Sequence, residues 1–128
     1  MAQAAAPAGY HTVSPYLVVS DGNRLMAFLK EVFDGEETER MENNGRLAHG
    51  EIRIGDSIVM MGEPSDPSRL THTMLYVYIA DPDATYKRGV AAGGVSFEEP
   101  NDTAYGDRRA AFRDPFGNEW FVAKQIAK

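Results

Sequence analysis

The sequence predicts an α+β fold, with two tandem βαβββ modules forming a curved, mixed and mostly antiparallel sheet around a cavity. Two observations predict this fold. Residues 16–35 and 76–94 carry the same pattern sixty positions apart, and residues 55–58 recur at 117–120, sixty-two positions apart. Neither half could bury its apolar face alone, so the two copies should pack together. The seam between two such halves is a natural place for a ligand cavity.

The bulk composition is that of a globular chain. Its 128 residues, 43% hydrophobic and 25% charged, are enough for one domain with its own core. The absence of cysteine excludes a disulfide framework, a thiolate metal site and a cysteine nucleophile. A net charge of −6 makes nucleic acid an unsuitable partner. Because no apolar run approaches the roughly 20 residues of a membrane span, we expect a cytoplasmic protein with no nucleic-acid or membrane partner.

The chain divides into a tail and one domain. Residues 1–11 lack the basic and long apolar regions of a secretory signal, and we expect them to be a flexible tail. The domain proper should cover residues 12–126. Within it we place module one at 12–63, a linker at 64–71 and module two at 72–126.

Module one should open with a strand and a helix. Residues 12–19 are β-branched and apolar, which is typical of a strand. Asp21 or Asn23 can cap the helix that follows, because a side-chain oxygen there accepts an unpaired backbone N–H. Gly35 fits the left-handed conformation that often ends a helix. Five apolar side chains recur at helical spacing and form one stripe: Leu25, Phe28, Leu29, Val32 and Phe33.

Three strands should complete module one. We place them at 36–41, 46–54 and 57–61, with an Asn-Asn-Gly turn at 43–45 and a tight turn at Gly55-Asp56. Alternation along the middle strand predicts that the side chains on its concave face are Leu47, His49, Glu51 and Arg53.

Module two should repeat this order. A strand at 72–80 precedes a helix that Asp81 caps and that carries Pro82 in its first turn. Three strands follow, near residues 95–99, 108–113 and 119–124. We interpret Asp114 as the residue that holds the turn between the last two strands, and Trp120 as a core residue.

Three segments together resemble a known family. The run from Tyr105 to Trp120, YGDRRAAFRDPFGNEW, and the segments Ser14–Val19 and Gly45–Met61 are similar to the vicinal oxygen chelate superfamily. The resemblance is strongest to its PhnB-like branch of glyoxalase/bleomycin resistance proteins. It implies one of several activities, because the superfamily includes metal-dependent isomerases, lyases, dioxygenases, fosfomycin-modifying transferases and proteins that only sequester drugs. It also implies a homodimer.

The resemblance implies four metal-ligand positions, which we place by counting from the helix caps and the turn glycines. They are occupied here by Ser14, Val59, Met74 and Phe121. None of these suits a divalent cation, since such ions take oxygen, imidazole or carboxylate ligands. We therefore expect no metal and no other cofactor. A strand slipped by two residues would bring His72 to the site, but it would restore a single ligand.

His49 and Glu51 are the candidate catalytic residues. They lie two apart on one strand and share a face, so the carboxylate can orient the imidazole for general acid–base work. The alternative is a buried polar pair whose members satisfy each other without chemistry.

Six side chains are candidates for ligand contact. They are Tyr16, Met61, Tyr76, Tyr105, Arg113 and Phe121. Arg113 occupies the place of Glu51 in the repeat, where a guanidinium could hold a carboxylate or phosphate; its alternative is an ion pair with Glu51 or Glu119. The tyrosines can stack on a flat ligand, or they can serve core and dimer packing.

Two functions follow from these residues. The first is a metal-independent protein that binds a small aromatic or amphipathic metabolite or drug between its two modules. The alternative is a metal-free isomerase or lyase that uses His49 and Glu51 as its acid–base pair. A metal-dependent glyoxalase or dioxygenase is disfavoured by the residues at the ligand positions.

Overall fold

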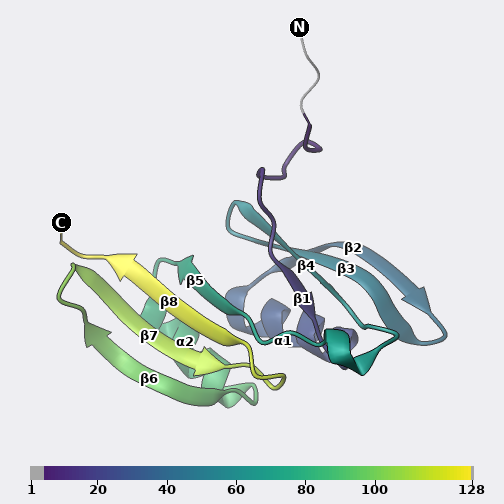
Figure 1. The fold of residues 1–128 in the computed structure, drawn as a ribbon. Coiled ribbons are helices and arrows are strands. Elements are labelled where there is room, and N and C mark those ends of the chain that lie inside the picture. The colour runs from purple at the N-terminus through teal and green to yellow at the C-terminus, as the bar shows by residue number, and fades with distance from the viewer. Residues whose placement is uncertain (1–4, 128) are drawn as a thin grey trace, which may run out of the picture. The chain divides into compact units, whose positions relative to one another are not determined.

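The computed structural model describes residues 5–127 and contains two four-stranded sheets, with one helix in each module (Figure 1). The strand orders are β1-β4-β3-β2 and β5-β8-β7-β6. In each sheet the first strand runs parallel to the last strand of its module, and the other neighbours are antiparallel. The predicted α+β fold with two tandem βαβββ modules is confirmed, and each module forms a sheet of its own.

Sheet 1 follows the predicted strands closely. Its members are β1 (Tyr16–Val18), β2 (Glu36–Asn43), β3 (Arg46–Ile54) and β4 (Ser57–Gly62). β1 is shorter than the strand predicted at 12–19. The β2–β3 turn falls where it was predicted, with Asn44 and Gly45 both at positive φ, as a two-residue hairpin turn requires.

Helix α1 (Gly22–Phe33) begins as predicted and ends differently. The Asp21 carboxylate accepts a hydrogen bond from the Arg24 N–H at 3.1 Å, which confirms the cap. The left-handed residue at the end is Asp34, at φ 54°, so the assignment of that conformation to Gly35 was wrong. Packing, and not backbone conformation, favours glycine at position 35, because a Cβ there would lie 2.5 Å from Cδ1 of Ile52.

Sheet 2 repeats the pattern. Its members are β5 (Met74–Tyr78), β6 (Val95–Asp102), β7 (Asp107–Arg113) and β8 (Glu119–Gln125). Helix α2 (Pro82–Ala91) has Pro82 in its first turn, and the Asp81 carboxylate accepts from the Ala84 N–H at 3.1 Å. The predicted cap and first-turn proline of this helix are confirmed.

In each sheet one face meets the helix of its module, and we call the other the open face. In sheet 1 a Cβ on Gly50 would lie 3.0 Å from Met26 of α1, so Gly50 faces the helix. Its cross-strand partner Met61 and the next partner Leu17 share that face and are fully buried. The open face of sheet 1 carries Tyr16, His49, Glu51 and Met60.

In sheet 2 the ring of Phe112 faces α2, because a Cβ on Gly89 would lie 2.8 Å from it. Trp120, paired with Phe112 and fully buried, lies on the same face, which confirms its place in the core. Alternation then assigns the open face of sheet 2 to Met74, Tyr76, Tyr78, Arg109, Ala111, Arg113, Glu119, Phe121 and Ala123.

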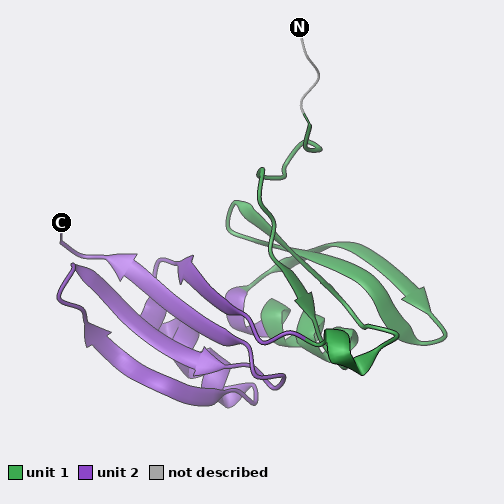
Figure 2. Cartoon of the chain, viewed as in Figure 1, with its two compact units in different colours: residues 1–30, 34–70 green, residues 31–33, 71–128 purple. Residues whose placement is uncertain are grey.

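The chain forms two compact units (Figure 2). Unit 1 contains residues up to 30 and residues 34–70, and unit 2 contains residues 31–33 and those from 71 onward. The last turn of α1 therefore belongs to unit 2. There the Phe33 ring lies 5.1 Å from the Trp120 ring, and Nε of Arg88 donates to the Val32 carbonyl at 3.0 Å.

A short 3₁₀ helix, η1 (Pro67–Arg69), follows β4. The Asp66 carboxylate accepts from the Ser68 N–H at 2.9 Å and fixes its first turn. Among the described residues, no helix has the length and apolar character needed to cross a membrane.

Candidate functional site

Four side chains form a hydrogen-bonded chain on the open face of sheet 1. Nε2 of His49 lies 2.6 Å from Oε2 of Glu51, and Nδ1 of His49 lies 3.1 Å from the Tyr16 hydroxyl. The Tyr10 hydroxyl donates to Oε1 of Glu51. Both ring nitrogens of His49 thus have partners, and this fixes the orientation of the imidazole.

The charge state of this chain follows from its contacts. Glu51 is 6% exposed, and burial alone raises the pKa of its carboxyl. Hydrogen bonds from Tyr10 and His49 outweigh burial, so the pKa of Glu51 lies below its ordinary value of 4.5. The hydrogen bond to this carboxylate raises the pKa of Tyr10. At neutral pH Glu51 is therefore ionised and Tyr10 is a neutral phenol, and His49 has this carboxylate as the partner of its Nε2.

A bulge in β3 decides which side chains share this face. Met41 pairs with His49 while Glu42 pairs with Leu47, so β3 has one extra residue between them. The extra residue reverses the alternation. Leu47 is fully buried and lies against Gly22 on the helix side. The prediction that Leu47 shares the face of His49 is therefore wrong.

Aromatic side chains cover the open face of sheet 2. The rings of Tyr76 and Phe121 stack 6.0 Å apart with 6° between their planes. Phe97 meets Phe121 edge-on at 5.8 Å, and Tyr78 lies 5.4 Å from Tyr76. Phe97 and Tyr76 are each about two-fifths exposed, at 41% and 40%. The face therefore offers accessible ring surface.

A buried carboxylate holds the tyrosines in place. The hydroxyls of Tyr76 and Tyr78 donate to Oδ2 of Asp107 at 2.8 and 2.9 Å. The Tyr76 hydroxyl also lies 2.9 Å from that of Tyr105. Burial, together with these hydrogen bonds, raises the pKa of Tyr76 well above its ordinary value. Tyr76 therefore stays a neutral phenol over the physiological range.

Two arginines border the aromatic rings. Arg109 makes a two-pronged pair with Glu98, at 2.7 Å from Nε and 2.8 Å from Nη2, so its charge is compensated. The guanidinium of Arg113 lies 4.4 Å from the Phe97 ring centroid and 3.4 Å from the Glu119 carboxylate. The ion pair with Glu119, one of the two interpretations of Arg113 open from the sequence, is thus present.

The two modules differ by one residue in their last turn. Residues 54–57 of module one correspond to residues 114–118 of module two, because Ile54 pairs with Ser57 and the Asp114 N–H donates to the Asn118 carbonyl. The modules are therefore offset by 60 positions in β3 and β7, and by 61 in β4 and β8. Arg113 corresponds to Arg53, and the predicted match of Arg113 to Glu51 is wrong.

The extra residue in the last turn of module two also changes one of the four metal-ligand positions that were placed by counting along the sequence. Phe121 is the partner of Tyr76 in sheet 2, whereas the partner of Tyr16 in sheet 1 is Met60. Val59 instead faces the helix and is buried. The corrected set is Ser14, Met60, Met74 and Phe121.

A hydroxyl, two thioethers and a phenyl ring do not suit a divalent cation. Within residues 5–127, no three His, Asp or Glu side chains are grouped so that they could hold a metal ion. His72 does not complete such a group, because β5 begins at Met74 in register with Glu119, and His72 precedes that strand. The residues present therefore do not fit the metal centre that the resemblance implies.

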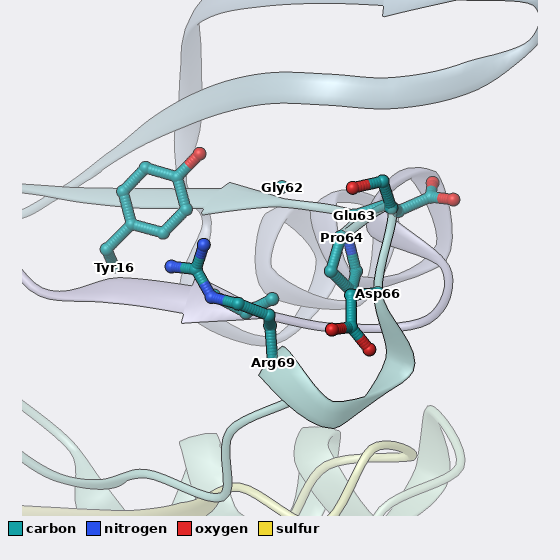
Figure 3. A pocket seen from close by; sticks show the side chains of 8 residues that line it. Tyr16, Gly62, Glu63, Pro64, Asp66 and Arg69 are labelled. Carbon is teal, nitrogen blue, oxygen red and sulfur yellow. The ribbon is translucent and has the colours of Figure 1, made fainter.

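Unit 1 also contains a pocket of about 720 Å³ beside the hydrogen-bonded chain (Figure 3). Its lining comes from β1, the end of β4 and the segment that follows: Tyr16, Val18, Gly62, Glu63, Pro64, Ser65, Asp66 and Arg69. Tyr16 belongs both to this lining and to the chain of hydrogen bonds that contains His49.

The fold and these sites can now be compared with known proteins. Residues 10–122 match the family model of the Glyoxalase/Bleomycin resistance protein/Dioxygenase superfamily. The chain belongs to this superfamily. An uncharacterized protein of Mycobacterium bovis, Mb0911c, is 29% identical over 126 residues, covering 89% of this chain and 83% of that protein.

Solved structures of other proteins share the fold. TioX from Micromonospora sp. ML1 has a TM-score of 0.77 at 24% identity, over 91% of this chain and 99% of TioX. A mutant of the fosfomycin resistance protein FosX from Listeria monocytogenes, solved with Mn(II) and a dihydroxypropylphosphonic acid, has a TM-score of 0.70 at 19% identity. This match covers 91% of this chain and 90% of FosX. These similarities show a common architecture.

In this member of the superfamily, the predicted ligand residues separate into groups. Tyr76, Tyr105, Arg113 and Phe121 gather at the aromatic face of sheet 2. Tyr16 lies on the open face of sheet 1, with the predicted pair His49 and Glu51. Met61 is fully buried on the helix side of sheet 1 and is left out of the site we propose below.

Sequence reasoning missed three contributors to these faces. Phe97 lies on a predicted strand, and alternation with its neighbours could have placed it. Tyr10 was assigned to the tail and Arg69 to the linker, and neither has a local signal. The hydroxyl of Tyr10 reaches a carboxylate 41 positions away, a contact that only the folded chain shows.

Proposed function

We propose that this protein is a metal-independent member of the superfamily that binds a small aromatic or amphipathic metabolite or drug. The observation that carries this proposal is the aromatic face of sheet 2, where Phe97 and Tyr76 present ring surface to solvent and pack edge-on and stacked against the buried Phe121 ring. Exposed apolar rings gathered on one face mark a ligand-binding surface.

The face is organised before any ligand arrives. The Asp107 carboxylate fixes two tyrosine hydroxyls, and Glu98 holds Arg109. Because these side chains are already ordered, binding a ligand costs little conformational entropy. A flat ring can stack on Tyr76 or Phe97. The Arg113 guanidinium, 44% exposed in its side chain, can donate to an acceptor on the same ligand.

Replacing Phe97 by alanine tests the aromatic face. We expect 2-naphthol to bind the wild-type protein saturably, and Phe97→Ala to weaken binding about three- to tenfold through the lost ring contact. The measurement is ligand-observed NMR titration. Tyr86→Ala is the matched control, because Tyr86 lies on α2 and bonds to Ser96. Equal affinity for the wild type and Phe97→Ala, or no saturable binding, contradicts the proposal.

A second candidate function rests on a different observation. The continuous hydrogen-bonded chain of Tyr10, Glu51, His49 and Tyr16 gives His49 an ionised partner on one nitrogen and a phenol on the other. This arrangement suits a metal-free isomerase or lyase in which His49 transfers a proton and Glu51 orients the ring.

On a substrate identified by screening, we expect His49→Ala to lower turnover by a factor of about 10² to 10⁴. Glu51→Gln should lower turnover less and change its pH profile, because it alters the partner of His49 but keeps the ring. The binding function predicts instead that His49→Ala leaves 2-naphthol affinity within about twofold. Full turnover by His49→Ala would eliminate the enzyme hypothesis.

Three further parts of the proposal rest on the sequence resemblance. They are membership of the PhnB-like branch, assembly as a homodimer and the small-molecule class of ligand. A cytoplasmic location is proposed from the composition, which has no cysteine and no apolar run of membrane-spanning length.

A further inference from the structure

The pocket of unit 1 is built from two opposite walls. Tyr16, Val18 and Gly62 come from the adjacent parallel strands β1 and β4, in which Val18 pairs with Gly62. The segment after β4, which includes η1, supplies the opposite wall with Pro64 and Arg69. The cavity volume of about 720 Å³ is within the range of small-molecule sites.

Gly62 keeps this pocket in its shape. A Cβ at residue 62 would lie 2.8 Å from the Tyr16 hydroxyl oxygen and 2.6 Å from the Ala48 carbonyl oxygen. Only glycine therefore lets the tyrosine ring lie over the strand with its hydroxyl 3.1 Å from His49. The position of the Tyr16 hydroxyl at the edge of the pocket is thus fixed by its packing against Gly62 and by its hydrogen bond to His49.

The two carboxylates of the lining already have partners. Glu63 accepts hydrogen bonds from the Gly22 and Leu47 N–H groups and from Nε of Arg46, all at 3.0 Å. Asp66 accepts from the Ser68 N–H. In Figure 3 the Glu63 and Asp66 carboxylates lie away from the Tyr16 ring. Neither carboxylate is directed at the space beside Tyr16.

The remaining charge in the lining is cationic and is directed at that space. Figure 3 shows the Arg69 guanidinium extended toward Tyr16. Within residues 5–127 this guanidinium makes no hydrogen bond and no ion pair within 4.0 Å, although its charge attracts the Asp66 carboxylate at longer range. An arginine fork and a phenolic hydroxyl that point into one pocket form a receptor for a planar anion.

We propose that this pocket is a binding site for a small organic carboxylate. The carboxylate lies between the Arg69 guanidinium and the Tyr16 hydroxyl, whose single proton turns from Nδ1 of His49 to the ligand, and the hydrocarbon part of the ligand packs on Val18 and Pro64. Two donor groups match the single charge of a carboxylate. A doubly charged phosphate is disfavoured, because Glu63 and Asp66 share the pocket wall. All residues of this lining belong to unit 1, and the proposal does not depend on the function proposed for the aromatic face of sheet 2.

The test uses an aliphatic probe that has no aromatic ring to stack on the aromatic face. Cyclohexanecarboxylate and its neutral analogue cyclohexanecarboxamide are titrated into the full chain, and backbone amide shifts are followed by NMR. We expect saturable shifts at Gly62 and Arg69 with the carboxylate and no saturation with the amide. Affinity should fall as NaCl is raised, because the pocket is open to screening.

Variants assign the effect to the two donors. Arg69→Gln should weaken carboxylate binding at least about fivefold, and Tyr16→Phe about threefold, since charge-assisted hydrogen bonds are lost. Arg53→Gln is the matched control, because Arg53 is an exposed arginine of the same unit that pairs with Glu36; its affinity should stay within about twofold of wild type. Unchanged amide spectra outside the substituted site confirm that each variant is folded.

Three results overturn the proposal. They are equal binding of the carboxylate and the amide, affinity in folded Arg69→Gln equal to that of the wild type, and binding of inorganic phosphate that depends on Arg69 while the carboxylate does not bind. The last result would assign the pocket to inorganic anions.

Discussion

Replacing Asp114 by alanine is expected to lower the free energy of unfolding by about 4 kcal/mol, the largest effect we expect of a turn residue. The Asp114 carboxylate is 3% exposed and accepts four hydrogen bonds. Oδ1 accepts from the Phe116 and Asn118 N–H groups at 2.8 and 3.1 Å. Oδ2 accepts from Nδ2 of Asn118 and from Nε1 of Trp120, both at 2.9 Å. Truncation would leave these donors in the interior without an acceptor.

Urea unfolding followed by circular dichroism measures this loss. Asp56→Ala is the matched control, because Asp56 occupies the corresponding turn of module one and its side chain is 89% exposed. We expect that control to stay within about 0.5 kcal/mol of wild type. Asp114→Asn should fall between the two, since an amide keeps one acceptor oxygen. A loss below about 1 kcal/mol in Asp114→Ala would show that the turn does not depend on this carboxylate.

Local patterns were sufficient to predict most elements of this fold. The bounds predicted for β3, 46–54, agree with the structure, as do the caps at Asp21 and Asp81. These features depend on alternation and on contacts within three residues, which a sequence displays directly. In module two the ladder between β7 and β8 is unbroken, so simple alternation along the two strands gives the open-face set of the structure: Arg109, Ala111, Arg113, Glu119, Phe121 and Ala123.

Predictions failed where one extra residue entered a ladder or a turn. The bulge before His49 places Leu47 in the core, although alternation predicted it on the open face. The longer turn at 114–118 shifted the residue count that had placed a metal-ligand position at Val59. An inserted residue reverses every side chain that follows it, and composition gives little warning of it. The roles of Tyr10 and Glu63 could not be predicted for another reason, because each contacts a partner 41 positions away.

Glu63→Ala is the second large effect that we expect, a loss of about 3 kcal/mol in the free energy of unfolding. The residue lies in the segment after β4, yet its side chain is only 7% exposed. Its Oε2 accepts from the N–H of Gly22, at the start of α1, and from that of Leu47, beside the bulge of β3. One carboxylate therefore joins the helix, the bulge and the wall of the pocket. Glu36→Ala, at a 71% exposed side chain, is the control and should cost less than about 0.5 kcal/mol.

The pH dependence of the stability difference between wild type and Glu63→Ala distinguishes a charged hydrogen-bond acceptor from simple hydrocarbon packing. Burial raises the pKa of Glu63, but hydrogen bonds from the Leu47 N–H, Arg46 and the Gly22 N–H outweigh it and hold the pKa below the ordinary value of 4.5. A carboxyl whose pKa is lowered by folding contributes stability above its unfolded pKa and loses it as the pH falls through the folded pKa. The stability gap between wild type and Glu63→Ala should therefore be full near pH 7 and shrink below about pH 4.5. A gap that stays constant from pH 7 to pH 3 would mean that Glu63 acts through its hydrocarbon stem, and the helix, bulge and pocket wall would then need another explanation for their common position.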